Sequence, residues 1–185
     1  MAEYYLVSQL PSLDGIGENT PLPITEERFD ELCERFLGKK AWDEMKKITL
    51  VPTREPVSTG SGFIDAWLSA ERLLRLALAK VRAERMKKSF DTGDVLLPAE
   101  YLKAAAMATE TENPMEAENY LNSFRLTSLE GMRPSDSFST DYIFYYAIKL
   151  KLLWRIRGFD KSAGEAAYKN IYGSVLDRAD TEVIE

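Results

Sequence analysis

The sequence predicts an all-α protein, a multi-helix bundle of about six or seven helices with a short extended N-terminal segment. Three observations support this fold class. Apolar residues recur at helical spacing along most of the chain, and most clearly between Phe63 and Phe90. Helix-capping sequences precede several of these stretches. With 45% hydrophobic residues, the chain of 185 residues also has enough apolar material to bury a sizeable core.

The N-terminal run over residues 4–10 is short, apolar and aromatic, and Pro11 ends it. We interpret it as a brief strand or as an extended segment lying on the core. Residues 11–23 contain two Gly and three Pro and are predicted to form a loop. Thr25 is then the expected N-cap of an amphipathic helix, which Gly38 ends.

Residues 39–49 are predicted to form a shorter helix. The stretch that follows, VPTREPVSTGSG over residues 51–62, combines Pro, Ser, Thr and Gly and has the composition of a linker or mobile loop. We therefore divide the chain into an N-terminal segment with a helical hairpin (residues 1–50), a linker (51–62) and a main helical body (63–185).

The helix that begins at Phe63 carries so wide an apolar stripe that we expect it to pack on two sides. Pro98 suits the first turn of the next helix. The sequence Asn-Pro-Met-Glu at residues 113–116 is a helix start, with Asn as the cap and Glu three residues later to bond back to it. A further helix ends at Gly158, and a capping sequence at Ser162 begins the last one.

Residue types that many enzymes need are absent or isolated. There is no histidine, which removes the commonest general base and metal ligand and excludes Ser-His-Asp and Cys-His catalysis. The single cysteine, Cys33, falls on the apolar face of a predicted helix, so we expect a buried, inert thiol. The fragments GIG (15–17) and GSG (60–62) lack the pattern of a nucleotide-binding loop. We therefore predict no catalytic, cofactor-binding or metal site and no enzymatic activity.

Charge and hydropathy limit the partners and the compartment. The net charge of −6 disfavours bulk nucleic-acid binding. The N-terminal residues lack the basic and apolar regions of a secretory signal, and no window approaches about 18 uncharged apolar residues. We expect a cytoplasmic protein with no direct membrane insertion.

The long helix is also the most basic part of the chain. Seven Lys or Arg and two Glu lie between Glu71 and Lys88, whereas residues 91–141 carry ten acidic and three basic residues. The basic face has three possible roles: a solvated helix surface, an internal partner of the acidic half, or a docking surface for an acidic partner. For a docking surface, the predicted partner-binding residues are the arginines of this face, namely Arg72, Arg75, Arg82 and Arg85.

A second cluster, over residues 142–157, combines tyrosines with cations. Aromatic side chains at such spacing are more often core than surface, and the cations beside them are more often rim. We therefore assign Phe144 and Trp154 to the core and leave Tyr145 open as a surface contact.

Four segments carry a resemblance to a known family. They are the opening YYLVSQLPSL, the helix FIDAWLSAERLLRLALAKVRAER, the stretch NPMEAENYLNSFRLTSLE and the sequence FYYAIKLKLLWRIRGFD. Together, and in this order, they resemble a bacterial family of uncharacterised proteins encoded alongside V/A-type ATPase subunits. That family is similar, more distantly, to the central-stalk C (or d) subunit, an all-helical protein that joins the central shaft to the membrane rotor ring.

The resemblance implies a non-enzymatic accessory or central-stalk-like subunit that acts in coupling or assembly through contacts with shaft or rotor subunits of the ATPase. It also implies a cytoplasmic location peripheral to the inner membrane, through the complex. This chain is much shorter than a full C subunit, and the family supplies no catalytic residues. The alternative is a free-standing cytoplasmic helical adaptor that binds an acidic protein partner through the basic face.

Overall fold

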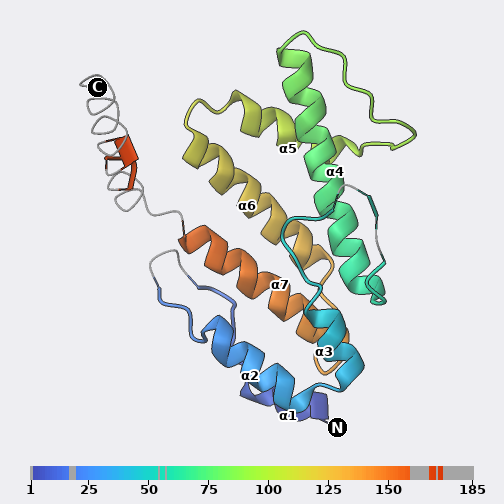
Figure 1. Ribbon diagram of the computed structural model, residues 1–185, viewed down its shortest axis with the longest axis vertical. Coiled ribbons are helices and arrows are strands. Elements are labelled where there is room, and N and C mark those ends of the chain that lie inside the picture. The colour runs from blue at the N-terminus through green and yellow to red at the C-terminus, as the bar shows by residue number, and fades with distance from the viewer. Residues whose placement is uncertain are drawn as a thin grey trace, which may run out of the picture.

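The computed structural model describes residues 2–16, 20–53, 55–56, 58–158, 167–169 and 171–172 (Figure 1). The prediction of an all-α fold is confirmed, because every regular element of these residues is a helix. The elements, in chain order, are α1 (Ala2–Gln9), α2 (Glu26–Phe36), α3 (Lys39–Met45), α4 (Gly62–Arg85), α5 (Ala99–Glu110), α6 (Pro114–Gly131) and α7 (Thr140–Arg157).

The N-terminal segment is helical, so the prediction of a strand or extended segment was wrong. Leu6 is fully buried, and Val7 and Leu10 pack against the same core, while Tyr4 and Tyr5 face outward. Leu10 follows Val7 by three residues and Leu6 by four, and these are the spacings of one helix face. Eight residues hold barely two turns, which is too few for the helical period to stand out in the sequence.

The predicted helix starts at Thr25 and Asn113 are confirmed. The side chain of Thr25 accepts a hydrogen bond from the backbone N–H of Arg28, and that of Asn113 accepts one from Met115. Glu116 bonds back as expected, although its Oε1 accepts from the side-chain amide of Asn113, at 3.1 Å, and not from the backbone. The capping sequence predicted at Ser162 lies outside the described residues.

The long helix α4 ends at Arg85, five residues earlier than the periodicity predicts. Lys87 has a φ of 55°, in the left-handed region, and the backbone N–H of Lys88 bonds to the carbonyl of Ala83 at 2.9 Å. This is the geometry of a helix C-terminus. Phe90, which the sequence pattern includes in the helix, is exposed.

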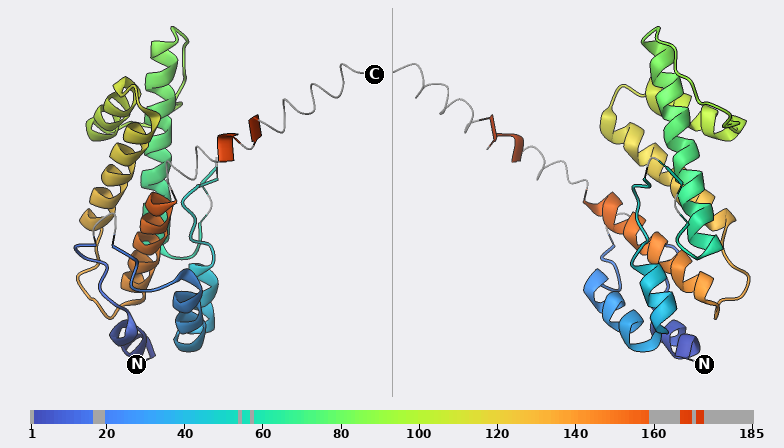
Figure 2. Two further views of the ribbon diagram at one scale, coloured as in Figure 1. Left: turned by 90° about the vertical axis from the view of Figure 1, so that its left-hand side faces the viewer. Right: turned by 45° about the vertical axis from the view of Figure 1, so that its right-hand side comes forward.

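Two apolar clusters divide the core, and α4 contributes to both. Its first half packs with α1, α2, α3 and α7 through Ile64, Trp67 and Leu68. Its second half packs with α5 and α6 through Leu74 and Leu78. Figure 2 shows α4 beside α5 and α6 along much of its length, with its N-terminal end next to α7. The wide apolar stripe of this helix therefore serves two different packing partners, as its width predicts.

The segment 51–62 is held at its C-terminal end. The carboxylate of Asp65 accepts hydrogen bonds from the hydroxyl of Ser58 and from the backbone and hydroxyl of Thr59, each at 2.8 Å. Lys47 donates to the carbonyl of Thr59 at 2.7 Å. These bonds fix the approach to α4, whose N-cap is Ser61. The division of the chain into residues 1–50 and 63–185 stays a prediction.

Replacement of Leu129 by Ala should lower the free energy of unfolding by about 2–5 kcal/mol, because this α6 side chain is completely buried and its loss leaves a cavity. Leu96→Ala is the matched control, since Leu96 is 89% exposed, and should change stability by less than about 0.5 kcal/mol. Urea unfolding followed by circular dichroism measures both. Equal effects of the two variants would contradict the assignment of Leu129 to the core.

Candidate functional site

The four arginines predicted to bind a partner lie in three different environments. Arg72 and Arg75 turn toward the segment before α4. Arg72 donates from Nε to the carbonyl of Thr53 at 3.2 Å. Arg75 donates to the carbonyl of Leu50 at 3.4 Å and pairs with Glu71 at 3.0 Å. Both side chains therefore have intramolecular partners and help to hold the chain that enters α4.

Arg85 turns the other way and donates a hydrogen bond to the carbonyl of Thr109 on α5. Arg82 is exposed, as are Lys87 and Lys88 just beyond the helix. Within the described residues, no ion pair joins the cations of the basic face to an acidic side chain of residues 91–141. The basic and acidic halves therefore do not pair in the way that the charge pattern suggests.

The two halves are joined instead by a pair of the opposite polarity. Glu71, an acid on the basic helix α4, meets Arg125, one of the few bases of the acidic half, on α6. Arg125 donates from Nε and Nη2 to the two carboxylate oxygens of Glu71, at 3.0 and 3.2 Å. The side chains are only 1% and 6% exposed. Removal of either partner would leave a buried, uncompensated charge.

The pair extends into a network that reaches α7. Nη1 of Arg125 donates to the Asn122 side chain at 2.9 Å and lies 3.2 Å from Glu118. Glu118 in turn accepts a hydrogen bond from Arg155 of α7 at 2.5 Å. One connected set of charges thus links α4, α6 and α7. The charged side chains of this set pair with one another, which is the arrangement of a structural network.

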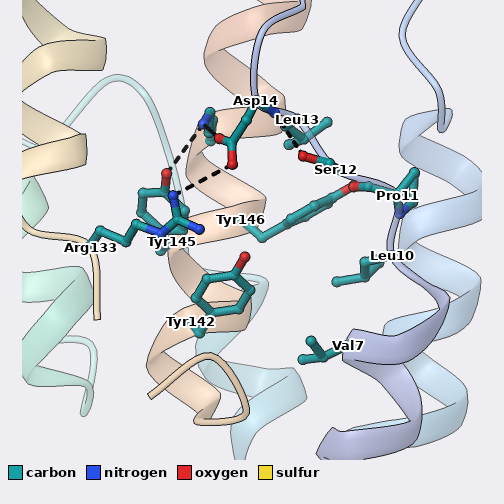
Figure 3. A pocket seen from close by; sticks show the side chains of 11 residues that line it. Val7, Leu10, Pro11, Ser12, Leu13, Asp14, Arg133, Tyr142, Tyr145 and Tyr146 are labelled. Atoms are coloured by element: carbon teal, nitrogen blue, oxygen red, sulfur yellow. Dashed lines mark hydrogen bonds and ion pairs between the residues drawn. The ribbon is translucent and has the colours of Figure 1, made fainter. Parts of the chain in front are cut away.

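A separate cavity of about 230 Å³ lies between α1, α7 and the ends of two loops (Figure 3). Val7 and Leu10 form its apolar side, and Tyr142 and Tyr146 of α7 face them. Residues 10–16, which we term the strap, run over this cavity. The hydroxyl of Tyr146 donates to the carbonyl of Pro11, at 2.9 Å, and so ties the strap to α7.

Lys149 is the centre of the charges beside this cavity. Its Nζ lies 2.6 Å from Asp14 of the strap, 2.6 Å from Glu130 of α6 and 3.3 Å from the hydroxyl of Tyr145. That hydroxyl donates to the same Glu130 oxygen at 2.6 Å. Three acceptors match the three N–H donors of an ammonium group. Lys149 therefore joins the strap, α6 and α7 at one point.

The ionisation of this cluster follows from its contacts. The hydrogen bond from Lys149 lowers the pKa of Asp14. Burial acts to raise the pKa of Glu130, but hydrogen bonds from Lys149 and Tyr145 outweigh it, so that the pKa is lowered. Burial likewise opposes the charge of Lys149, and its acidic partners nevertheless raise its pKa. Burial, with the hydrogen bond to Glu130, raises the pKa of Tyr145 to about 12.

Arg133, in the connection between α6 and α7, completes the cluster. Its guanidinium lies over the rings of Tyr142 and Tyr145, 5.8 and 5.6 Å from their centroids. It is 3.6 Å from Asp14 and 3.9 Å from Glu130. These distances are those of ion pairs without direct hydrogen bonds. Cation–π contacts therefore position Arg133 together with the two carboxylates.

Sequence reasoning missed this cluster and misplaced two aromatic residues. Phe144 is buried as predicted, but Trp154 is 37% exposed and Tyr145 is buried, so the core assignment of Trp154 and the surface alternative for Tyr145 were wrong. Lys149, which the sequence pattern places at the rim, is only 8% exposed. An available signal was its position between Ile148 and Leu150, directly after the apolar and aromatic run of residues 142–148.

At neutral pH the titratable groups of this cluster hold their protons and charges firmly. The raised pKa values keep Lys149 and Tyr145 protonated, so neither is poised as a general base. Cys33 is buried as expected, and burial raises the pKa of its thiol to about 12. Across the described ranges, no group of three or more Cys, Asp or Glu is arranged to hold a metal ion. In the same part of the chain, no helix has the length and apolarity to cross a bilayer.

Arg125→Met should lower the free energy of unfolding by about 3–5 kcal/mol, because it leaves the Glu71 carboxylate buried without its main partner. Adding Glu71→Leu should recover part of this loss, so that the double variant costs less than the sum of the single variants. Arg28→Met is the matched control, since Arg28 pairs with Glu31 in solvent, and should cost less than about 1 kcal/mol. Additive effects at residues 71 and 125 would contradict a direct buried pair.

Asp14→Asn should remove a contribution to stability that depends on pH. The pKa of Asp14 is lower in the folded than in the unfolded protein, so its ionised carboxylate stabilises the fold. This stabilisation is complete when the pH is above the unfolded-state pKa of about 3.9, and it is lost as the pH falls through the folded-state pKa. The side chain is 57% exposed, so we expect a loss of about 1 kcal/mol or less at pH 7. Urea unfolding from neutral to strongly acidic pH tests this. A difference between wild type and variant that stays constant with pH would contradict the Asp14–Lys149 bond.

Comparison with known proteins places part of the chain beside one family. Residues 88–178 are similar to a family model described as "Protein of unknown function (DUF2764)". No curated protein and no solved structure matches the chain. The matched region includes Arg133, Tyr142 and Lys149, whereas α1 and the strap precede it. The network around Arg125 likewise falls within the match on α6 and α7, while its partner Glu71 lies before it.

Proposed function

We propose that this protein is a non-enzymatic connecting subunit that joins two other proteins through contacts at opposite ends of its helical body. The observation that carries the proposal is the distribution of exposed apolar side chains. Among the exposed apolar side chains, two groups lie far apart, one in the connection after the C-terminus of α4 and one at α1. In Figure 1 the first lies toward the upper end of the molecule and the second at its lower end.

The first surface, the α4–α5 surface, is formed by Met86, Lys87, Lys88, Phe90 and Leu96. Leu96 is 89% exposed, and Met86 and Phe90 are also exposed. Apolar side chains flanked by lysines suit a partner that has an apolar contact area with acidic residues around it. Arg82, one of the arginines predicted from the sequence, lies exposed on the adjoining turn of α4 and belongs to the same charged border.

The second surface, the aromatic surface, is formed by Tyr4, Tyr5 and Phe138. All three are at least about half exposed, and the rings of Tyr4 and Phe138 stack with centroids 4.7 Å apart. Tyrosine and phenylalanine are enriched at protein interfaces, and tyrosine also among the residues that contribute most of the binding energy. A stacked pair is partly ordered before binding, which lowers the entropy that association costs.

For the identity of the partners, the proposal relies on the resemblance to proteins encoded alongside V/A-type ATPases. The partners are then shaft and rotor subunits of such an ATPase, and the role is coupling or assembly at the membrane face of the complex. The internal use of the charges on Glu71, Arg125 and Lys149 supports a structural rather than a catalytic role for them.

One observation favours the alternative of a free-standing adaptor for an acidic partner. Arg82, Lys87 and Lys88 are exposed together, and in the described residues none of them forms an ion pair. The alternative needs this basic border alone, whereas the connecting role needs both surfaces.

Affinity purification from gently extracted native membranes, with identification of the bound proteins, tests the proposal. We expect ATPase subunits to be recovered with the wild-type protein. Met86→Asp with Leu96→Asp should lose one partner, and Tyr5→Asp with Phe138→Asp should lose a different one, because a carboxylate in each apolar contact opposes its burial. Met107→Asp is the matched control, since Met107 is exposed on α5 outside both surfaces.

The two functions give different results in this experiment. Two results together would support the adaptor. The recovered partner would be a protein other than an ATPase subunit, and its binding would be lost only with Arg82→Glu and Lys88→Glu. Recovery of the intact ATPase without this protein, and unchanged coupling after its deletion, would contradict the ATPase role.

A further inference from the structure

The cavity beneath the strap has the features of a small binding site, independent of the two docking surfaces. It has an apolar side, from Val7 on α1 and Leu10 at the start of the strap, and an aromatic side, from Tyr142 and Tyr146 on α7 (Figure 3). Its volume of about 230 Å³ is below the roughly 300–1,000 Å³ of sites for drug-sized molecules. A ligand of amino-acid size fits this space.

Of the two cations that line the cavity, one is already satisfied and the other is available. Lys149 has three acceptors within 3.3 Å, which use its three donors. Arg133 is held by ring stacking and by two carboxylates no closer than 3.6 Å. Both contacts are longer than an ordinary hydrogen bond, so a ligand that approaches more closely can compete for the guanidinium donors. A planar guanidinium is suited to bind a carboxylate in a bidentate manner.

The charges around the cavity determine the net charge of the ligand that fits. Arg133 and Lys149 supply two positive charges, and Asp14 and Glu130 supply two negative charges, so the cluster is neutral. Beside a neutral cluster, a ligand with a single charge is attracted by the groups of opposite sign and repelled by those of like sign. A zwitterion is attracted at both of its charges, because its carboxylate can meet Arg133 while its ammonium group meets Asp14.

We infer that this cavity binds a small zwitterionic ligand, a free amino acid with an apolar side chain. The α-carboxylate accepts hydrogen bonds from Arg133, the α-ammonium donates to Asp14, and the side chain packs against Val7 and Leu10. The unequal contacts of Asp14 agree with this arrangement. Its Oδ1 accepts from Lys149 at 2.6 Å, whereas its Oδ2 is 3.6 Å from Arg133 and can accept from a ligand.

Isothermal titration calorimetry of the full chain with leucine and phenylalanine tests the inference. We expect binding of at least one of them at millimolar concentrations or below. Three probes each lack one part of the recognised group: 4-methylpentanoate has no ammonium, 3-methylbutylamine has no carboxylate, and glycine has no apolar side chain. Each should bind at least about tenfold more weakly, the effect of losing one charge-assisted contact or the apolar one.

Arg133→Met, which keeps the apolar stem but removes the guanidinium, should weaken leucine binding by at least about tenfold. Arg28→Met is the matched control and should leave binding unchanged, because Arg28 is exposed on α2 and pairs with Glu31. Circular dichroism establishes whether Arg133→Met is folded. If Arg133→Met does not fold, Tyr142→Phe is the second variant. It removes only a hydroxyl that lines the cavity and should weaken leucine binding by a few fold.

Absence of heat with every amino acid tested would overturn the inference. Equal binding of leucine and 4-methylpentanoate, or of leucine and 3-methylbutylamine, would overturn the assignment of a zwitterion. Leucine binding that is unchanged in folded Arg133→Met and in Tyr142→Phe would place the ligand elsewhere and would equally overturn it.

Discussion

The buried pair between Glu71 and Arg125 is the constraint on which the arrangement of the helices depends. It joins α4 to α6 at two hydrogen-bonding positions, and Glu118 then carries the connection to Arg155 on α7. Apolar packing is tolerant of small rotations, whereas a bidentate carboxylate–guanidinium contact is specific in distance and direction. The pair therefore sets the relative position of the helices that the two apolar clusters hold together. Because both charges are buried, a different register of α4 against α6 would leave each without its partner.

A second charged cluster has a similar role at the middle of α7. Lys149 brings together Asp14 of the strap and Glu130 of α6, and Tyr146 adds a hydrogen bond to Pro11. The two clusters differ in exposure, since Asp14 and Glu130 lie partly in solvent while Glu71 does not. A partly solvated cluster can exchange partners at lower cost than a buried one. This difference agrees with a fixed helical body that carries a more adaptable site at the strap.

Local signals in the sequence predicted local structure well. Thr25 and Asn113 are caps because a side-chain oxygen near the first turn satisfies backbone donors there, which depends on few residues. The class of the fold follows from the apolar period of the longer helices. The prediction of a strand or extended segment over residues 4–10 was wrong because a helix of two turns is too short to show the helical period. The prediction that the long helix reaches Phe90 was wrong because the apolar pattern continues past the point where α4 still has a packing partner.

The candidate sites could not be predicted from local sequence patterns, because they depend on which helices pack against each other. The composition of the two halves suggested that basic residues of α4 pair with the acidic residues that follow, yet the pair that forms uses Glu71 and Arg125, each a minority charge in its own half. Asp14 and Lys149 are 135 positions apart in the chain. Nothing in the neighbourhood of either residue indicates the other, so contacts of this kind become visible only when the packing of α7 against the strap is known.

The position of α4 has a mechanical consequence. This helix has 24 residues and is therefore about 36 Å long, and its two halves are anchored in different apolar clusters. A helix packed along its whole length behaves as a stiff rod, so a force applied at its free end is transmitted to α7 and not absorbed in a loop. For a protein that bridges two partners, such a rod would transfer torque or displacement from one partner to the other with little loss.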